Sequence, residues 1–483
     1  MPQQVRKDAL IIFILLAFVF AYFYQDGGYN GNSRFGLIFA IVQEGRLSID
    51  SYHDKVDTKT GDEAYYNGHY YSDKAIGPSL LGTAFYVPLY WMKLTLNHPS
   101  LVTTMKQILT FLVIGLPSAF AGSLIYILCL YLSKSRFRAF VVTLAITLGT
   151  LYLPYSVIFF SHQFTSALLF SAFFMIFLLK KKPETWKNGY LCLIGLLLGW
   201  ALISEYPSAI IIFPLVIYYF SIVWRNTNNR NLRSILLPTL TAIIPISIQL
   251  LYNKLCFGNF LSIAYTYSDN PYFRTSMQQG VMGIHWPDWN ALYYMTLHPT
   301  MGLFWESPVL LLSTIGAGVI LLENSYREEA ILVLWIICSY LVIMSGYYMW
   351  WGGFAVGPRH IIPILPYFVF FLAFVPKRFN WPFVGLSLVS IGQMLIAAAS
   401  NVLVPDTMVL KINTLGFFEY SNIYNYCLKQ LIEGKFTQNL GHRFLGLNSW
   451  SSLIPLVIVI VGATFLFFWI GRDANKCLKT TSV

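Results

Sequence analysis

The chain has 483 residues, of which 56% are hydrophobic and only 11% charged, and its mean hydropathy is +0.59. Soluble domains usually carry about a quarter of charged residues, so this composition excludes a large soluble domain and indicates an integral membrane protein. The net charge of +11 raises the question of nucleic acid, but the positions of the basic residues argue against that partner.

The basic residues cluster in short connections between apolar blocks. The clusters are Arg6 and Lys7; Lys134, Arg136 and Arg138; Lys180 to Lys182 with Lys187; Arg225, Arg230 and Arg233; Arg327; Lys377 and Arg378; and Arg472, Lys476 and Lys479. The positive-inside rule places all of them in the cytoplasm. The basic composition therefore reports membrane orientation, with no nucleic acid as partner.

Twelve membrane-spanning helices of 16 to 26 residues satisfy this orientation, with both termini in the cytoplasm. They are predicted near residues 9–25, 107–132, 138–158, 164–180, 189–204, 208–224, 235–252, 300–322, 330–347, 361–376, 381–402 and 453–471. The fold class is all-α and polytopic, a single membrane domain over residues 1–483 with large outer loops at 26–106, 253–299 and 403–452. The first span follows "MPQQVRKD" without a small-residue cleavage site, which predicts a retained span and not a removed signal peptide.

Two further helices are predicted in the first outer loop. The apolar segment 76–92 is excluded as a span, because it would send the basic residues of "KSRFR" to the outer face; we expect an outer-surface or partly immersed helix. Four apolar residues recur at helical spacing after "NSR": Phe35, Ile38, Phe39 and Val42. This pattern fits an amphipathic helix at the membrane interface and, equally, an ordinary packed loop helix.

Ionisable side chains gather at the outer ends of the predicted spans. They are Arg34 and Lys74 in the first loop, His162 in "FFSHQFTS", Glu205 in "LISEYPSA", Glu306 in "GLFWESPV", and Arg359 with His360 in "WWGGFAVGPRH". Such groups are costly at membrane depth unless they face the bundle interior, water or one another, so each is a functional candidate. A lone His162 is more often a structural residue, and Glu205 would also serve as the partner of a cation. The convergence of so many on one face favours a site.

The mixture of these residues suggests a phosphate ligand. Arg34, Lys74 and Arg359 suit a phosphate or diphosphate at the outer interface, and the apolar setting suggests a phosphate carried on a lipid. Nearby aromatic residues would stack on a sugar ring, although tryptophan and tyrosine also form belts at membrane interfaces. They are Tyr70, Tyr71, Trp350 and Trp351.

Carboxylates on the same side would supply a general base for a sugar transfer. Asp73 is the first candidate, followed by Asp50 and Asp26, with Glu205 as an acceptor-side carboxylate; Asp62 and Glu63 are on this side as well. Asp73 directly precedes Lys74, and a salt bridge between them would lower the pKa of Asp73 and make it an anchor for the lysine. No ligand cluster requires a metal, so no cofactor is certain; a divalent cation would find oxygen ligands in Asp26 and Asp50.

One span, a long outer loop with an "SR" helix, the segment "YYSDKAIGPS" and many further spans together resemble the GT-C superfamily of polyprenyl-phosphate-dependent glycosyltransferases. The plan is similar to that of lipid A aminoarabinose transferases and protein O-mannosyltransferases. Those families carry "KPP" or "HPP" at the end of the first loop, and "DKAIG" looks like its counterpart, which implies that Lys74 lies near the carrier phosphate. Their acidic pair on the first interfacial helix is absent, because Gly31 and Asn32 precede Ser33 and Arg34 here.

The motifs "NSRFGL", "YYNGHYYSDKAIGPSLL", "FFSHQFTSALL", "SEYPSA", "FWESPVLLL" and "MWWGGFAVGPRHIIPILP" also resemble a subgroup of bacterial membrane proteins described as phospholipid-carrier glycosyltransferases. This resemblance implies a multi-pass protein of the bacterial cytoplasmic membrane with an extracytoplasmic active site. From the residues and the resemblance together, we expect transfer of a sugar from a polyprenyl-phosphate donor to a lipid, glycan or protein acceptor. The substrate-binding candidates are Arg34, Lys74 and Arg359 for the phosphate, with His162, His360, Tyr71, Trp350 and Trp351.

Two alternatives stay open. A flippase or transporter for a lipid-linked sugar would use the same groups without chemistry, although the polar residues sit at the outer ends of spans and no internal repeat is evident. A non-catalytic subunit of a glycan assembly complex is the second alternative, because the usual acidic pair is missing.

Overall fold

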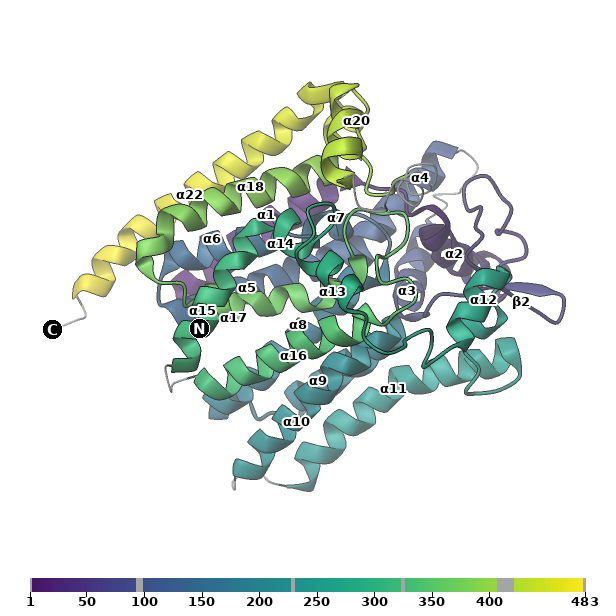
Figure 1. The fold of residues 1–483 in the computed structure, drawn as a ribbon, viewed down its shortest axis with the longest axis horizontal. Coiled ribbons are helices and arrows are strands. Elements are labelled where there is room, and N and C mark those ends of the chain that lie inside the picture. The colour runs from purple at the N-terminus through teal and green to yellow at the C-terminus, as the bar shows by residue number, and fades with distance from the viewer. Residues whose placement is uncertain (1, 93–98, 227–230, 323–325, 406–420, 481–483) are drawn as a thin grey trace.

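The structure is a computed structural model that describes residues 2–92, 99–226, 231–322, 326–405 and 421–480 (Figure 1). Helices run side by side along much of its length, and the described part contains two small two-stranded sheets. Seven of the described helices are long and apolar enough to cross a membrane, and three shorter apolar helices accompany them. The chain is an all-α polytopic membrane protein.

A helical segment lies at each of the twelve predicted spans. In chain order these segments are α1 (Gln3–Tyr22); α4 (Pro99–Thr110) continuing through the π-helix Phe111–Gly115 into α5 (Leu116–Ser133); α6 (Arg136–Thr147) with α7 (Tyr152–Ser156); α8 (Ser161–Lys181); α9 (Asn188–Ser204); α10 (Ala209–Arg225); α11 (Leu232–Phe257); α15 (Leu312–Leu322); α16 (Arg327–Ser345); the 3₁₀-helix Arg359–Phe368 with α17 (Val369–Leu372); α18 (Asn380–Ala399); and α22 (Ile454–Thr480).

Burial separates the central helix from the peripheral ones. In α8, 89% of the most apolar 18-residue window is buried, whereas only 17% of that window in α11 and 11% in the Ser449–Ile470 segment are buried. All three windows are strongly apolar, with mean hydropathies of 1.7, 1.9 and 2.7, and a helix of this kind must be covered either by protein or by lipid. Helix α8 therefore forms the core of the bundle, and α11 and α22 present their apolar side chains to the bilayer.

The first loop folds into α2 (Gly28–Phe39), a π-helical turn (Ala40–Glu44), a hairpin and α3 (Gly77–Trp91). Phe35, Ile38 and Phe39 are fully buried in a cluster with residues of α3 and α4. Since Ser33 and Arg34 on the same helix are buried too, α2 is a packed helix with no solvated polar face. Of the two interpretations of its sequence pattern, the packed loop helix is the one observed.

The hairpin consists of β2 (Glu63–Tyr66) and β3 (His69–Ser72), joined by Asn67 and Gly68. Both turn residues have positive φ, 51° and 85°, as the Asn-Gly turns of tight hairpins require. The register pairs Glu63 with Ser72, so the residues that follow outward in the ladder, Asp62 and Asp73, leave the hairpin side by side.

Helix α3 corresponds to the segment expected outside the set of spans, and it begins against the end of α9. A Cβ added to Gly77 would lie 2.1 Å from Oγ of Ser204 and 3.0 Å from its backbone N and Cα. Glycine at the first turn therefore permits contact of the two backbones. This contact brings Lys74, just before α3, close to Glu205, just after α9.

The C-terminal part of the chain closes over the end of α1. Strand β4 (Gln438–Asn439) pairs antiparallel with β1 (Phe23–Tyr24), with Tyr24 opposite Gln438. On either side of β4 lie α20 (Leu428–Ile432) and α21 (Leu440–Leu445), and α22 follows. The middle loop contains α12 (Pro271–Gln278), α13 (Trp289–Thr296) and α14 (Leu303–Glu306).

Candidate active site

Charged residues from distant parts of the chain meet at one end of the bundle. We call this group the buried polar cluster: Arg34, Asp62, Asp73, Lys74, Ser161, His162, Glu205, Arg359 and His360. Ion pairs, hydrogen bonds, ring contacts or electrostatic interactions link each member to another. The cluster unites most of the candidates from the sequence.

Three hydrogen bonds hold the side chain of Arg34, which extends from α2. Its Nη1 donates to the Ala75 carbonyl at 2.8 Å, its Nη2 to Oγ of Ser161 at 2.7 Å, and its Nε to Oδ1 of Asn30 at 3.2 Å. The residue is 2% exposed. Ser161 in turn donates to Oε1 of Glu205, so one hydroxyl connects the guanidinium to the carboxylate.

Lys74 lies between two carboxylates. Its Nζ is 2.9 Å from Oδ2 of Asp62 and 3.1 Å from Oδ1 of Asp73. It also lies 5.5 Å from the centre of the Tyr265 ring. Burial lowers the pKa of Lys74, but the two carboxylates outweigh this effect and raise it, so the lysine is a cation.

Asp73 does pair with Lys74, yet the expected consequence is wrong. Burial raises the pKa of Asp73 to about 6, and the charge of Asp62 adds to this effect, while Lys74 and Arg34 only partly oppose it. Lys74 does lower the pKa of Asp73, but burial of the carboxyl outweighs the lysine charge. A carboxyl with a pKa near 6 suits a general base at neutral pH.

Glu205 follows α9 and faces the start of α8. Its Oε1 lies 3.1 Å from Nδ1 of His162, and the His162 ring contacts the His360 ring edge to face at 5.0 Å. Burial raises the pKa of Glu205, and Arg34 opposes the rise. Nε2 of His360 is buried without a hydrogen-bond partner among the described residues.

Arg359 enters the cluster from a glycine-rich loop. Its guanidinium carbon lies 4.8 Å above the ring of Phe160, and its Nε is buried without a hydrogen bond to any described residue. Gly352 and Gly353 have φ of 85° and 75°, and a Cβ on Gly352 would come within 2.9 Å of Cγ of Arg359. The two glycines thus let the loop backbone approach the Arg359 side chain closely. The Nε of Arg359 is left as a donor to a ligand.

The other proposed bases lie in different surroundings. Asp50 accepts hydrogen bonds from the Tyr70 amide at 2.7 Å and from Nδ1 of His69 at 2.8 Å, so it supports the hairpin. The side chain of Asp26 is 65% exposed and lies 3.9 Å from Nζ of Lys106, which donates hydrogen bonds to Oδ1 of Asn32 on α2 and to the Asp57 carbonyl. Neither is joined to the buried polar cluster by a described ion pair or hydrogen bond.

The aromatic candidates pack within the fold. Tyr71 lies against Phe257, with ring centres 5.3 Å apart. Trp350 stacks with Tyr294 at 6.0 Å and meets Trp351 at 5.7 Å. Their role toward a sugar stays a prediction.

Sequence reasoning did not select Asp62 or Ser161, and it did not name Tyr265 or Lys106. A signal for Asp62 was present, because the Asn-Gly turn at 67 and 68 sets a register that brings residue 62 beside residue 73. Glu306 is 1% exposed and lies against Gly357, where a Cβ would be 2.6 Å from its Oε2. It shares no described ion pair with the cluster.

Within the described ranges, no group of three or more histidine, cysteine, aspartate or glutamate side chains has an arrangement that could hold a metal ion. Asp26 and Asp50, the expected oxygen ligands, have different neighbours. A divalent cation stays an untested expectation.

Comparison with known proteins gives a likeness at the level of structure. No family model matches the chain, and no curated protein matches it. A search of solved structures finds a similarity to the crystal structure of ArnT from Cupriavidus metallidurans bound to undecaprenyl phosphate, with 12% sequence identity, 96% of this chain and 75% of that chain covered, and a TM-score of 0.46. At this level the likeness assigns neither a substrate nor a role to residues of this chain.

Proposed function

We propose that this protein is a glycosyltransferase of the GT-C type. It moves a sugar from a polyprenyl-phosphate donor to a lipid, glycan or protein acceptor at the extracytoplasmic face of the bacterial cytoplasmic membrane. The observation that carries the proposal is the meeting of Arg34, Lys74 and Arg359 with the carboxylates of Asp73 and Glu205 in one buried site at an end of the helical bundle.

The cations suit the leaving group. A departing polyprenyl phosphate gains negative charge, which fixed donors in a site shielded from water stabilise strongly. Arg359 has a buried Nε free of any described hydrogen bond, and Lys74 holds a charge between two carboxylates. The phosphate oxygens would bind these two groups, with Arg34 behind them as a rigid positive charge.

The carboxylates suit the acceptor. In the proposed reaction the acceptor hydroxyl oxygen attacks the anomeric carbon, and its proton passes to the carboxylate of Asp73. The bond between the anomeric carbon and the phosphate oxygen breaks, and its electron pair leaves with the polyprenyl phosphate. Glu205, held by Ser161 and His162, would bind a neighbouring hydroxyl of the acceptor.

The length of α8 supports the proposed orientation. Ser161 and His162 begin this helix and Lys180 and Lys181 end it, and 21 residues of α-helix extend about 30 Å, the thickness of the hydrocarbon core. Lys180 pairs with Glu328 and Glu329 at 2.8 and 2.7 Å, in a region that also contains Arg225. If that basic end is cytoplasmic, the buried polar cluster is extracytoplasmic.

The test is transfer by the full chain in nanodiscs, with a radiolabelled polyprenyl-phosphate sugar and membrane extract as acceptor. We expect label in product, and a loss of about 10²- to 10⁴-fold in kcat for Asp73→Asn, the range of general base catalysis. Lys74→Ala should also lower transfer, because the proposed phosphate contact is lost; Lys254→Ala is its matched control, because Lys254 is exposed on α11. Translocation of the donor across vesicles without product would instead identify a flippase, and full turnover by a folded Asp73→Asn protein would remove Asp73 as the base.

A further inference from the structure

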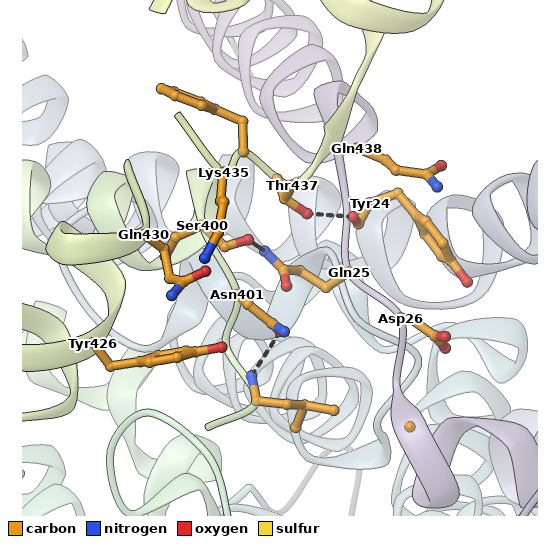
Figure 2. Close-up of a pocket in the computed structure, with 13 residues that line it drawn as sticks. Tyr24, Gln25, Asp26, Ser400, Asn401, Tyr426, Gln430, Lys435, Thr437 and Gln438 are labelled. Atoms are coloured by element: carbon orange, nitrogen blue, oxygen red, sulfur yellow. Dashed lines mark hydrogen bonds between the residues drawn. The ribbon is translucent and has the colours of Figure 1, made fainter. Parts of the chain in front are cut away.

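A second cavity opens beside the buried polar cluster, where the outer C-terminal segment covers the end of α1 (Figure 2). Its volume is about 470 Å³. Three stretches line it: residues 24–28 after α1, residues 400–403 after α18, and residues 426–438 around α20 and β4. We infer that this cavity is a binding site for a neutral carbohydrate, which the proposed transferase would use as its acceptor.

The walls of the cavity are held in place by the backbone. The Gln25 side chain donates to the carbonyls of Ala398 at 2.8 Å and Ser400 at 3.1 Å, and it accepts from the Val402 amide at 3.1 Å. Thr437 donates its hydroxyl to the Tyr24 carbonyl at 2.7 Å. All three stretches are thus fixed to one another before a ligand arrives, which lowers the entropic cost of binding.

The lining offers neutral hydrogen-bonding groups and aromatic rings. Figure 2 shows Tyr426, Gln430 and Lys435 on one side of the cavity and Asn401 and Gln25 facing them. In the described part of the chain, the side-chain amide of Gln430 makes no hydrogen bond and lies half-buried, and the side chain of Gln438, whose backbone pairs with Tyr24, makes none either. Amides pair with sugar hydroxyls as donor and acceptor at once, and the ring of Tyr426 offers an apolar face for a sugar ring.

The charges of the lining argue against an anionic ligand. Lys435 already lies 2.8 Å from the Glu433 carboxylate, and Asp26 adds a negative charge at the rim. A phosphate is bound best by several cations or backbone donors, whereas Lys435 is the one cation among the described residues that line this cavity. A lipid chain is equally unsuitable, because amides and hydroxyls would lose their hydration on contact with it.

Two contacts join the stretches that line the cavity to the buried polar cluster. A Cβ on Gly27 would lie 3.4 Å from the Phe160 ring, and that ring carries the guanidinium of Arg359. On the other side, the Val356 amide donates to the Val402 carbonyl at 2.9 Å, which joins the loop of Arg359 to the cavity wall. A saccharide bound here would approach the site of the proposed chemistry. Its role as acceptor rests on the proposed function, whereas its binding does not.

Binding is tested by saturation-transfer NMR on the full chain in nanodiscs free of glycoside detergent, with cellobiose, mannobiose and chitobiose as probes. We expect at least one disaccharide to bind. Gln430→Ala and Tyr426→Ala should each raise its Kd at least tenfold, which corresponds to about 1.4 kcal/mol. Gln278→Ala, at an exposed glutamine of α12, is the matched control, and Lys74→Ala should leave saccharide binding unchanged. Equal thermal unfolding of all variants establishes that they fold.

Three results would overturn the inference: no disaccharide binds, binding survives both cavity variants, or inorganic phosphate displaces the saccharide. The acceptor role has its own readout, a KM for acceptor at least tenfold higher in Gln430→Ala with the KM for donor unchanged. If saccharide binding depends on the cavity but no transfer occurs, the binding site stands and the proposed function fails. If transfer occurs with an unchanged acceptor KM, the cavity is not the acceptor site.

Discussion

Substitution of Asp62 by Asn should shift the pH dependence of the reaction through Asp73. Both carboxylates contact Nζ of Lys74, at 2.9 and 3.1 Å, so their nearest oxygens are at most about 6 Å apart. The groups around Asp73 include Lys74, Asp62 and Arg34, with Tyr265 and Glu63 close enough to interact with its charge; Asp62 raises its pKa whereas Lys74 and Arg34 lower it. Removal of the Asp62 charge leaves burial as the main effect that raises the pKa of Asp73, and both cations still oppose it.

The magnitude follows from Coulomb's law. Two unit charges about 6 Å apart repel by roughly 3 kcal/mol at an effective dielectric constant of about 20. The Asp62 side chain is 17% exposed, so solvent reduces this value, and about half to all of it is a reasonable range. Since a pKa changes by one for about 1.4 kcal/mol, the pKa of Asp73 should fall from about 6 to between roughly 4 and 5.

The assay is kcat/KM from pH 4 to 8 with the full chain in nanodiscs. A base must be deprotonated, so activity of the wild-type protein should rise with pH through about 6. In the Asp62→Asn protein, the acid limb of the kcat/KM profile should lie one to two pH units lower than in the wild-type protein. Asp54→Asn is the control, because that side chain is 78% exposed on the same loop. An acid limb that stays near pH 6 in Asp62→Asn, or moves upward, would refute the role given to the shared lysine.

Three further predictions concern binding and stability. Arg359→Lys should weaken binding of polyprenyl phosphate about tenfold in a titration, because an ammonium lacks the planar fork of the guanidinium; unchanged affinity would place the phosphate elsewhere. Asp8→Asn should lower the free energy of unfolding by about 3 kcal/mol or more, because Asp8 is 1% exposed and receives hydrogen bonds of 2.6 Å from both Nε and Nη2 of Arg136; donor affinity should not change, and a loss of affinity at equal stability would contradict a structural role. Gly77→Ala should cost about 1–3 kcal/mol, measured by thermal unfolding, because its Cβ would collide with Ser204 at 2.1 Å; unaltered stability would show that α3 moves freely against α9.

The positions of the helices followed from the sequence because apolar length and basic clusters are local signals. Each predicted span coincides with a helical segment, and the segment 76–92 is α3. The packing of α2 was not decided by its pattern, because apolar residues at helical spacing look alike whether their partner is a membrane surface or another helix. Contacts with α3 and α4 settled the question.

Some residues of the candidate site were likewise evident from the sequence, and others only from the structure. Arg34, Lys74, Glu205 and Arg359 were recognisable one by one, because an ionisable residue at the end of an apolar segment is conspicuous. Asp50 and Asp26 carried the same signal as Asp73, and only their surroundings separate them. The adjacent Lys74 predicts a lowered pKa for Asp73, whereas burial raises it and Asp62, eleven residues earlier in the chain, adds to the rise.

The sequence by itself determined that this protein is a helical membrane protein, where its helices lie and which ionisable residues are candidates, because hydropathy and charge are properties of short segments. The tertiary structure decided which candidates meet. Asp62 lies beside Asp73 through the register of a hairpin, Lys74 lies near Glu205 through the contact of Gly77 with α9, and the second cavity exists because β4 pairs with the end of α1. These contacts join residues up to several hundred positions apart, and the energies that select them belong to the packed molecule and not to any single segment.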